Sequence, residues 1–468
     1  MIERFDLCIL GAGSGGLSVA AGAAQLGQSV ALIEPHAMGG DCLNTGCVPS
    51  KALLAAAKAA HSGGMAAAFG VHFAAPRIDF GAVKDHVSRV IAAIEPNDSQ
   101  ARFEGLGCTV IRAPGSFVAR DMVAAGGRQI RARRFVIATG SRAAVPPIPG
   151  LADTPYLTNE TIFALREAPV HLIIIGGGAI GCEMAQAHRR LGCAVTVVDM
   201  AAILPRDDAD LVEIVRAALE AEGVALIEHM SIERAEATPG GVRLVLGDGR
   251  VVDGSHLLVA AGRVPTVDGL GLEVAGVDYA RSGIKVDARR RTTNKRIFAI
   301  GDCREGPQFT HAAGYEAGIV IQNALFRLPA KVNYAALPWV TFTDPELAQV
   351  GLTEAAARAA HGQVSVLRWS FAENDRAQAE KRTEGMAKLV LVKGKVAGAS
   401  IVGPNAGELI QIWSAAITAK LPLRAIAGMI APYPTYAEIN KRLAGSAFTK
   451  SLFSDRTRKI VKFLQWFG

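Results

Sequence analysis

Long hydrophobic runs are missing from this sequence. No stretch approaches the ~18 consecutive apolar residues that a membrane-spanning helix requires, and Lys58 and His61 interrupt even the alanine-rich segment that follows Leu53. A cleaved signal is not expected either, because the strand-like run Phe5–Leu10 leads directly into the glycines that begin at Gly11. With 50% hydrophobic residues, the composition predicts a globular, cytoplasmic protein.

A strong charge of one sign is also missing. The chain has 50 Lys and Arg against 43 Asp and Glu, and the net charge of +7 is spread thinly over 468 residues. This charge is too diffuse to indicate a nucleic-acid partner. The length is sufficient for about three domains, each with its own core.

Cysteine is scarce, with seven residues in all. Four of them lie in apolar or strand-like settings, which predicts buried packing residues: Cys8, Cys108, Cys182 and Cys193. Two others, Cys42 and Cys47, are separated by four residues in the string GGDCLNTGCVPSK, which runs from Gly39 to Lys51. Two cysteines at this spacing are the arrangement of a redox-active disulfide. The alternative interpretation is a structural disulfide or half of a zinc site. Zinc needs a second ligand pair at suitable spacing, and the other five cysteines supply none, so no metal site is expected.

The string predicts a reactive cysteine. A helix rich in Ala, Leu and Lys is expected to begin near Pro49 or Ser50, which places Cys47 at or just before a helix N-terminus. The free N–H groups and the dipole of that terminus favour a thiolate, so the pKa of Cys47 should lie below the free value of about 8.5. Nearby glycines, including Gly40, let a flat ligand approach the backbone.

The first residues predict a dinucleotide-binding βαβ unit. A buried strand, a glycine-rich turn and a helix to about Leu26 are followed by a second strand that ends at Glu34. In such a unit the first glycine makes the tight turn, the second admits the pyrophosphate, the third lets the helix pack on the strand, and the acid meets a ribose hydroxyl. These roles fall to Gly11, Gly13, Gly16 and Glu34.

The same unit recurs further along the chain. The strand Leu172–Ile175 leads into Gly176, Gly178 and Gly181, and the strand Ala194–Val198 ends at Asp199. Gly11 to Glu34 and Gly176 to Asp199 both span 23 residues, so two dinucleotide sites are predicted.

Position in the chain assigns the two cofactors. A cofactor that reduces a disulfide must lie against it, so the first site, near the cysteines, is predicted to hold FAD and the second a nicotinamide. Asp199 would repel a 2′-phosphate, which favours NADH over NADPH. Arg206 argues the other way, since a guanidinium could accommodate that phosphate.

The string GGDCLNTGCVPSK resembles the active-site signature of the class I pyridine nucleotide–disulfide oxidoreductases, which include dihydrolipoamide dehydrogenase, glutathione reductase and mercuric reductase. The resemblance implies an α/β fold with two Rossmann-like dinucleotide-binding domains, for FAD and NAD, and a C-terminal α+β dimerisation domain. It also implies that Cys47 faces the flavin, that Cys42 exchanges with the substrate, and that Asp41 lies at the flavin.

The same resemblance covers nearly the whole chain and implies four segments. They are 1–147, the first part of the FAD domain; 148–265, the NAD domain; 266–336, the second part of the FAD domain; and 337–468, the interface domain.

Other motifs carry family roles by resemblance. Thr139 and Gly140 lie in a segment like the one that leaves the FAD domain, and Gly262 in one like the return. Asp302 corresponds to the aspartate that holds the flavin ribityl chain, although a helix-capping role is the alternative. Cys303 follows it without a partner in sequence, and a redox role for this cysteine is not favoured. Lys51 and Glu183 correspond to a pair beside the flavin and nicotinamide; otherwise both are solvent-facing helix charges.

The chain departs from the family in its C-terminal segment. Thiol-specific members carry a catalytic histidine and an orienting glutamate there, and this sequence has Tyr433 and Glu438. A phenol with a pKa near 10 is a poor proton shuttle at pH 7, which disfavours dihydrolipoamide dehydrogenase activity. Mercuric reductase has a tyrosine there but needs a C-terminal cysteine pair, and no cysteine follows Cys303. Soluble transhydrogenases lack the disulfide, which argues against that activity.

Residues 449–468 combine four basic side chains with leucine, isoleucine, valine, phenylalanine and tryptophan. This pattern predicts a basic amphipathic helix, which either makes peripheral contact with an anionic membrane or packs on the dimer. The resemblance itself implies a homodimer.

The sequence therefore predicts a homodimeric FAD enzyme that transfers electrons from NADH through flavin to the Cys42–Cys47 disulfide and on to a small disulfide, a metal ion or another protein's thiols. Two alternatives are a divergent dihydrolipoamide dehydrogenase and a membrane-docked, redox-responsive binding protein. The residues do not identify the electron acceptor.

Overall fold

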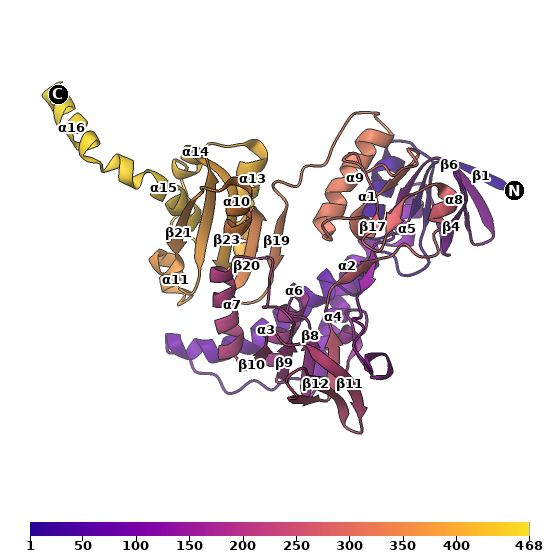
Figure 1. The fold of residues 1–468 in the computed structure, drawn as a ribbon, viewed down its shortest axis with the longest axis horizontal. Helices are drawn as coiled ribbons and strands as arrows, with labels where there is room; N and C mark the ends of the chain where they lie inside the picture. Colours follow the sequence, from indigo (N-terminus) through magenta and orange to yellow (C-terminus); the bar gives the residue numbers. More distant parts are fainter. Residues whose placement is uncertain (468) are drawn as a thin grey trace. The chain divides into compact units, whose positions relative to one another are not determined.

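The computed structural model describes residues 1–467, which form two compact units. The first unit contains Met1–Gly176, Ala187–Val198 and Met230–Val332; the second contains Gly177–Gln186, Asp199–His229 and the chain from Asn333 onward (Figure 1). The chain therefore leaves the first unit and returns to it twice. None of the described helices is long and apolar enough to cross a membrane.

The first unit is built on a seven-stranded sheet in the order β3-β2-β1-β6-β5-β4, with β18 also paired to β6. Its strands are β1 (Ile2–Leu10), β2 (Val30–Ile33), β3 (Cys108–Ile111), β4 (Gly115–Ala119), β5 (Met122–Ala125), β6 (Arg128–Ile137) and β18 (Ile297–Ala299). β1 runs parallel to both β2 and β6. Strands buried on both faces read as continuous apolar runs, which is why Leu7–Leu10 is apolar throughout.

The helices of the first unit include α1 (Ser14–Gln25), α2 (Gly40–Asn44), α3 (Cys47–Met65), α4 (Phe80–Ile94), α5 (Gln100–Gly105), α8 (Leu272–Ala275) and α9 (Thr310–Ala324). α1 and α9 lie side by side (Figure 1), and their buried residues, such as Leu17 and Val320, share one core with β1 and β2. Two helices distant in sequence thus begin close to the same edge of the sheet.

The first unit also contains a parallel group and three small antiparallel groups of strands. β8 (His171–Ile175) pairs in parallel with β9 (Ala194–Val198) and β14 (His256–Val259). The antiparallel groups are β11 (Ile232–Thr238), β12 (Gly241–Leu246) and β13 (Val251–Gly254); β7 (Ser141–Ala143) with β15 (Arg263–Pro265); and β16 (Tyr279–Ala280) with β17 (Gly283–Ile284). α6 (Ala179–Arg190) follows β8.

The second unit is organised around an antiparallel sheet in the order β19-β20-β23-β22-β21. Its strands are β19 (Pro338–Thr341), β20 (Glu346–Gly351), β21 (Ser365–Ser370), β22 (Met386–Val392) and β23 (Lys395–Gly403). The remaining elements of this unit are α7 (Ala209–Ala221), β10 (Val224–Ile227), α10 (Glu354–His361), α11 (Asp375–Ala379), α12 (Ala406–Leu409), α13 (Gln411–Ala419), α14 (Leu423–Ala427), α15 (Glu438–Leu452) and α16 (Asp455–Leu464). Trp413 and Leu443 are buried where α13 and α15 pack on the sheet.

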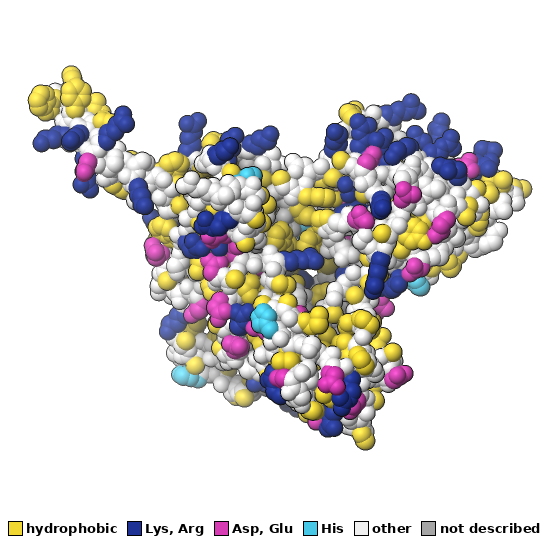
Figure 2. All heavy atoms as spheres, viewed as in Figure 1, with side chains coloured by type: hydrophobic (Ala, Val, Ile, Leu, Met, Phe, Trp, Pro, Cys, Tyr) yellow, Lys and Arg dark blue, Asp and Glu magenta, His cyan; other side chains and the backbone are white. Residues whose placement is uncertain are grey.

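The predicted amphipathic helix over 449–468 is wrong as a single element. Residues up to Leu452 complete α15, and α16 begins anew at Asp455. The break occurs at Ser454, whose hydroxyl accepts a hydrogen bond from the Thr457 N–H and caps the second helix. α16 projects beyond α15 (Figure 1), and Figure 2 shows hydrophobic and basic side chains together at its end. Gly468 lies outside the described residues.

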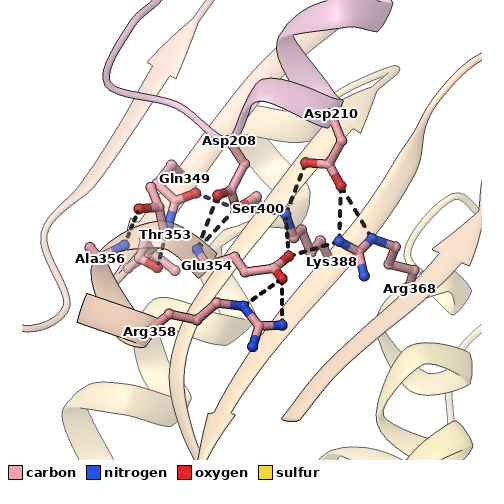
Figure 3. Close-up of polar contacts among 11 residues, drawn as sticks. Asp208, Asp210, Gln349, Thr353, Glu354, Ala356, Arg358, Arg368, Lys388 and Ser400 are labelled. Atoms are coloured by element: carbon pink, nitrogen blue, oxygen red, sulfur yellow. Dashed lines mark hydrogen bonds and ion pairs between the residues drawn. The ribbon is translucent and has the colours of Figure 1, made fainter. Parts of the chain in front are cut away.

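A buried lysine ties α7 to the sheet of the second unit. Lys388 on β22 is 3% exposed, and its Nζ lies 2.8 Å from Asp210 and Glu354 and 3.2 Å from Asp208. Figure 3 shows the three carboxylates converging on this ammonium from α7 and α10. Ser400 on β23 also donates a hydrogen bond to Asp208 at 3.3 Å. The start of α7 is thus fixed to β22 and β23.

The α/β class is confirmed, and so are most predicted elements. The strand at 194–198 has the bounds that the sequence predicted, and the helix after the cysteines begins at Cys47, two residues earlier than expected. The four predicted cysteines are buried. The boundaries at 147, 265 and 336 stay predictions.

Candidate active site

The two reactive cysteines lie on a pair of consecutive helices. Cys42 is in α2, which ends at Asn44, and Cys47 is the first residue of α3. Gly46 lies between the helices, where an added Cβ would come 2.9 Å from the Asp41 carbonyl oxygen. The tight bend therefore needs a glycine, and it brings the two sulfurs together. They are not bonded to each other in this structure; Cys42 is half-buried and Cys47 is exposed.

The two reduced cysteines share one proton, which Cys42 keeps. The Cys42 thiol donates a hydrogen bond to Cys47, and together with a hydrogen bond from Thr310 and the charge of Lys51 this lowers the pKa of Cys47 to about 6. The same interaction with Cys47 raises the pKa of Cys42. At pH 7 the reduced pair consequently holds a thiolate on Cys47 and a thiol on Cys42. The predicted direction for Cys47 is confirmed.

Sequence reasoning missed Thr310. Its hydroxyl lies 3.4 Å from the Cys47 sulfur, although 263 residues separate them. Thr310 is the first residue of α9, and the hydroxyls of Thr310 and Ser14, the first residue of α1, also hydrogen-bond Cys42. Two helix N-termini thus face the sulfur pair, and both favour negative charge there.

The first glycine motif forms an open cradle next to these helices. An added Cβ would lie 2.3 Å from the Ala138 carbonyl oxygen at Gly11, which has φ +104°, and 1.9 Å from the Gly11 carbonyl oxygen at Gly16. At Gly13 the nearest atom is the Cα of Gly40, at 3.9 Å. Gly11 and Gly16 are therefore required by the fold, whereas Gly13 leaves space for a ligand at the start of α1.

Glu34 fixes this cradle. Its Oε2 accepts a hydrogen bond from the Ala12 N–H at 2.7 Å, and its Oε1 accepts one from the His36 N–H at 2.8 Å. The carboxylate is buried at the end of β2. Each oxygen keeps a second lone pair that a ribose hydroxyl can use, so the residues fit the adenosine half of FAD.

Asp302 lies on the short helix that follows β18 and is part of a polar chain. Its Oδ2 accepts a hydrogen bond from the Ser141 hydroxyl at 2.7 Å, and Arg263 Nη2 lies 3.0 Å from Asp41 Oδ2. Burial raises the pKa of Asp302. The helix-cap alternative is wrong, because Asp302 is within the helical turn and not at its N-cap. The chain of side chains joins Asp302 to the helix that carries Cys42.

The remaining predicted residues of the FAD segments lie near these polar side chains. The Thr139 hydroxyl donates to the Thr266 carbonyl oxygen at 2.7 Å, and the Thr266 N–H donates to the Gly140 carbonyl oxygen at 2.9 Å. Gly262 accepts from the Ala144 N–H at 2.9 Å. These bonds hold β7 and β15 together beside Asp302, so the exit and return segments meet as two adjacent strands.

The second glycine motif has the same pattern of closed and open glycines. At Gly176, an added Cβ would lie 2.5 Å from the Ala260 carbonyl oxygen, while nothing lies within 4 Å of one at Gly178. Asp199 Oδ2 accepts from the Gly177 N–H at 2.6 Å, as Glu34 does in the first motif. Gly181 is buried in α6, and Arg206 is exposed. This motif therefore also fits a dinucleotide.

The other predicted site residues lie as follows. Glu183 is 4% exposed, and its Oε1 accepts from the Phe342 N–H at 2.9 Å. It is therefore not a solvent-facing charge, and its pairing with Lys51 stays a prediction. Cys303 is buried and donates to the carbonyl oxygens of Ile137 and Ile300 at 3.4 and 3.2 Å. The described residues contain no group of three or more ligands arranged to hold a metal ion.

Tyr433 is exposed and lies before α15, whose first residue is Glu438. The Tyr433 hydroxyl donates a hydrogen bond to Asp375 Oδ2 at 2.8 Å. That bond and the charge of Asp375 raise the pKa of Tyr433 further above its ordinary value. The phenol is thus held as a donor and cannot accept a proton near pH 7.

Two family models match the chain. Pyridine nucleotide-disulphide oxidoreductase matches residues 5–317, and the dimerisation domain of that family matches residues 337–444. The chain therefore belongs to the pyridine nucleotide-disulphide oxidoreductase family, whose members use FAD and NAD(P)H.

The individual relatives have different activities. Mercuric reductase of Streptomyces lividans is 35% identical over 96% of this chain and 97% of its own. Dihydrolipoyl dehydrogenase of Geobacillus stearothermophilus is 35% identical over 93% of this chain and 94% of its own. The Cu(II) complex of RclA, an HOCl-induced flavoprotein disulfide reductase from Escherichia coli, is 28% identical with a TM-score of 0.84, over 94% of this chain and 99% of that chain.

The comparisons confirm the predicted fold class: FAD and NAD domains of Rossmann type with a dimerisation domain. They also support a redox-active disulfide and a homodimer. The protein is a flavoprotein disulfide reductase of the group that contains mercuric reductase, lipoamide dehydrogenase and RclA.

Proposed function

We propose that this protein oxidises NADH and uses the Cys42–Cys47 pair to reduce a thiophilic metal ion. The observation that carries the proposal is the hydrogen bond from Tyr433 to Asp375 at 2.8 Å. Oxidation of a dithiol substrate needs a base that removes its protons, and a phenol that donates to a carboxylate is no such base. A metal ion brings no proton to be removed.

The cysteine pair supplies what a soft metal ion needs. Thiolate is the metal-binding form of cysteine, and Cys47 is a thiolate above a pH of about 6. Binding a metal ion to both sulfurs displaces the proton of Cys42. Two electrons then leave the sulfurs and the Cys42–Cys47 bond forms; one Hg(II) takes both electrons, whereas two Cu(II) take one electron each. With Cu(II) the balance is one NADH and two Cu(II) giving NAD⁺, one proton and two Cu(I).

FAD, when bound, carries two electrons from NADH to the disulfide. Around it we assign Gly13, Glu34 and Asp302 to holding the cofactor, with Thr310 and Lys51 stabilising the Cys47 thiolate. Asp199 supports NADH over NADPH, because its carboxylate repels a 2′-phosphate, and the exposed Arg206 makes no contact with it among the described hydrogen bonds and ion pairs.

The relatives support, in part, a metal ion as the electron acceptor. Mercuric reductases and the Cu(II) complex of RclA place metal ions in this group. We propose that the ion reaches Cys42 and Cys47 directly, because Cys47 is exposed and Cys42 is only half-buried.

The test compares acceptors in steady-state NADH oxidation, with Cu(II), Hg(II), lipoamide and glutathione disulfide, in the wild type and in Tyr433→His and Tyr433→Phe variants. We expect turnover with a metal ion to exceed turnover with lipoamide by about tenfold or more, and Tyr433→Phe to keep it. Tyr433→His should raise dihydrolipoamide oxidation at pH 7, since an imidazole has a pKa near 6.5.

Rapid oxidation of dihydrolipoamide by the wild type would overturn the metal-ion proposal and favour the divergent dihydrolipoamide dehydrogenase. Slow NADH oxidation with every acceptor, combined with redox-dependent capture of one protein, would favour the redox-responsive binding protein.

A further inference from the structure

The helix α16 has no packing partner among the described residues. All its side chains are exposed except that of Thr457, which is partly buried. Its apolar residues are among the most exposed in the molecule, and the following turn, η7 (Gln465–Phe467), adds an indole and a phenyl ring. The exposed fractions are 47% for Ile460, 50% for Val461, 59% for Phe463, 58% for Leu464, 83% for Trp466 and 75% for Phe467.

Four of these six apolar side chains share one side of the helix. Residues three or four positions apart lie on the same face, which groups Ile460, Phe463, Leu464 and Phe467. The rings of Phe463 and Phe467 are in contact, with centroids 5.2 Å apart. Arg458 and Lys462 project from the opposite side, whereas Arg456 and Lys459 lie beside Ile460 and Phe463. The helix is therefore amphipathic, with a basic polar face.

The charge around this face has one sign. Residues 439–467 contain seven basic side chains, namely Lys441, Arg442, Lys450, Arg456, Arg458, Lys459 and Lys462, and one acidic side chain, Asp455. Asp455 is 91% exposed and lies 3.6 Å from Arg458, so it offsets one charge only weakly. Six net positive charges thus accompany the exposed aromatic and aliphatic side chains of residues 460–467.

We infer that α16 and η7 dock the protein onto an anionic lipid surface. The apolar face enters the boundary between headgroups and acyl chains, and the lysines and arginines remain at the phosphates. A helix of ten residues is about 15 Å long, half of what is needed to cross the ~30 Å hydrocarbon core, so it lies along the surface.

Charge decides between a lipid surface and a second copy of this chain. Two copies of α16 would bring together like charges, and the whole chain has a net charge of +7. Anionic phospholipids attract the same residues. Tryptophan and phenylalanine at the end of the helix are also the residues that favour the membrane interface.

The test is co-sedimentation of the full FAD-loaded protein with vesicles of equal parts phosphatidylglycerol and phosphatidylcholine, and with vesicles of phosphatidylcholine alone. We expect binding to the first and not to the second, with a loss in high salt because exposed charges are then screened. A charge-reversal variant, Arg458→Glu, Lys459→Glu, Lys462→Glu, should lower the bound-to-free ratio about tenfold or more. Phe463→Ser with Phe467→Ser should lower it similarly.

The matched control reverses two exposed lysines at the β22–β23 turn, Lys393→Glu and Lys395→Glu, and should keep at least half of the vesicle binding. Equal binding by the α16 variants and the wild type would overturn the inference, as would an equal loss in the control, which would indicate attraction by overall charge. A fall in native mass of the α16 variants, without any wild-type vesicle binding, would show that a second copy occupies this face. FAD content and NADH oxidation of each variant verify that it has folded.

Discussion

At the scale of single residues, the chemistry depends on how one proton is divided between two sulfurs. The sequence predicted a low pKa for Cys47 from its position at a helix N-terminus. The structure adds the partners that a linear reading cannot find, because Thr310 is 263 residues away in sequence. Asp375, which accepts the hydrogen bond from Tyr433, is 58 residues away, at the start of α11. Such partners are determined by the packing of separate elements.

The role of Thr310 can be measured directly. In the reduced protein, alkylation of Cys47 by iodoacetamide should follow a pH midpoint near 6, since the thiolate reacts and is lost as pH falls through its pKa. Thr310→Val removes the hydroxyl that stabilises the thiolate and should move the midpoint upward. Thr310→Ser keeps the hydroxyl and serves as the control. An unchanged midpoint in Thr310→Val would remove the threonine from the site.

At the scale of elements, the glycine motifs divide into positions that the fold needs and positions that a ligand needs. The sequence predicted both motifs and their strands, because apolar runs that end in glycines are a local signal. It could not separate the two kinds of glycine, since their difference lies in the atoms opposite: Ala138 faces Gly11, while Gly13 faces open space.

Gly13→Ala therefore offers a clean test of the FAD cradle. Gly13 has φ −83°, which alanine adopts without strain, and its added methyl group would meet no atom closer than 3.9 Å. We expect the unfolding temperature of the apoprotein to stay within about 2 °C and the affinity for FAD to fall at least tenfold. Fluorescence titration with FAD measures the second quantity. Wild-type affinity would show that FAD does not approach this glycine.

The lysine cluster of the second unit is an element-scale feature that the sequence did not reveal. Lys388 is the one polar residue among the apolar residues of β22, and a lysine at that position could equally have faced water. Hydrogen bonds to Asp210 and Glu354 outweigh burial and raise its pKa. The hydrogen bond from Lys388 likewise lowers the pKa of Glu354 to about 2.

Lys388→Met should destabilise the second unit strongly, because it leaves three carboxylates facing one another at a buried position. Breaking one side of a buried ion pair costs roughly 3–5 kcal/mol. Thermal unfolding followed by circular dichroism measures the change, with the exposed Lys393→Met as a control that should be close to neutral. A loss below ~1 kcal/mol would mean that the cluster contributes no more than surface pairs do.

Acid titration tests the carboxylates of the same cluster. Glu354 has a pKa below its unfolded value, so its contribution is complete above pH 4.5 and is lost as pH falls from 4.5 toward 2. The unfolding free energy of the wild type should decline over that window. Glu354→Gln should start less stable and decline less steeply. Parallel pH profiles for the two proteins would contradict this assignment.

At the scale of the whole molecule, the sequence identified the two dinucleotide units and the family, because glycine spacing and the cysteine string are local patterns. It missed the break at Ser454, since continuous amphipathic periodicity conceals a helix cap.

The most direct test of the account is an anaerobic titration of the oxidised, FAD-loaded protein with NADH, followed by alkylation and peptide mass spectrometry. If electrons pass from NADH into the Cys42–Cys47 disulfide, one equivalent of NADH should make these two cysteines alkylatable, while the buried cysteines stay unlabelled. Oxidation of NADH and bleaching of the flavin without any new label at Cys42 or Cys47 would contradict the account.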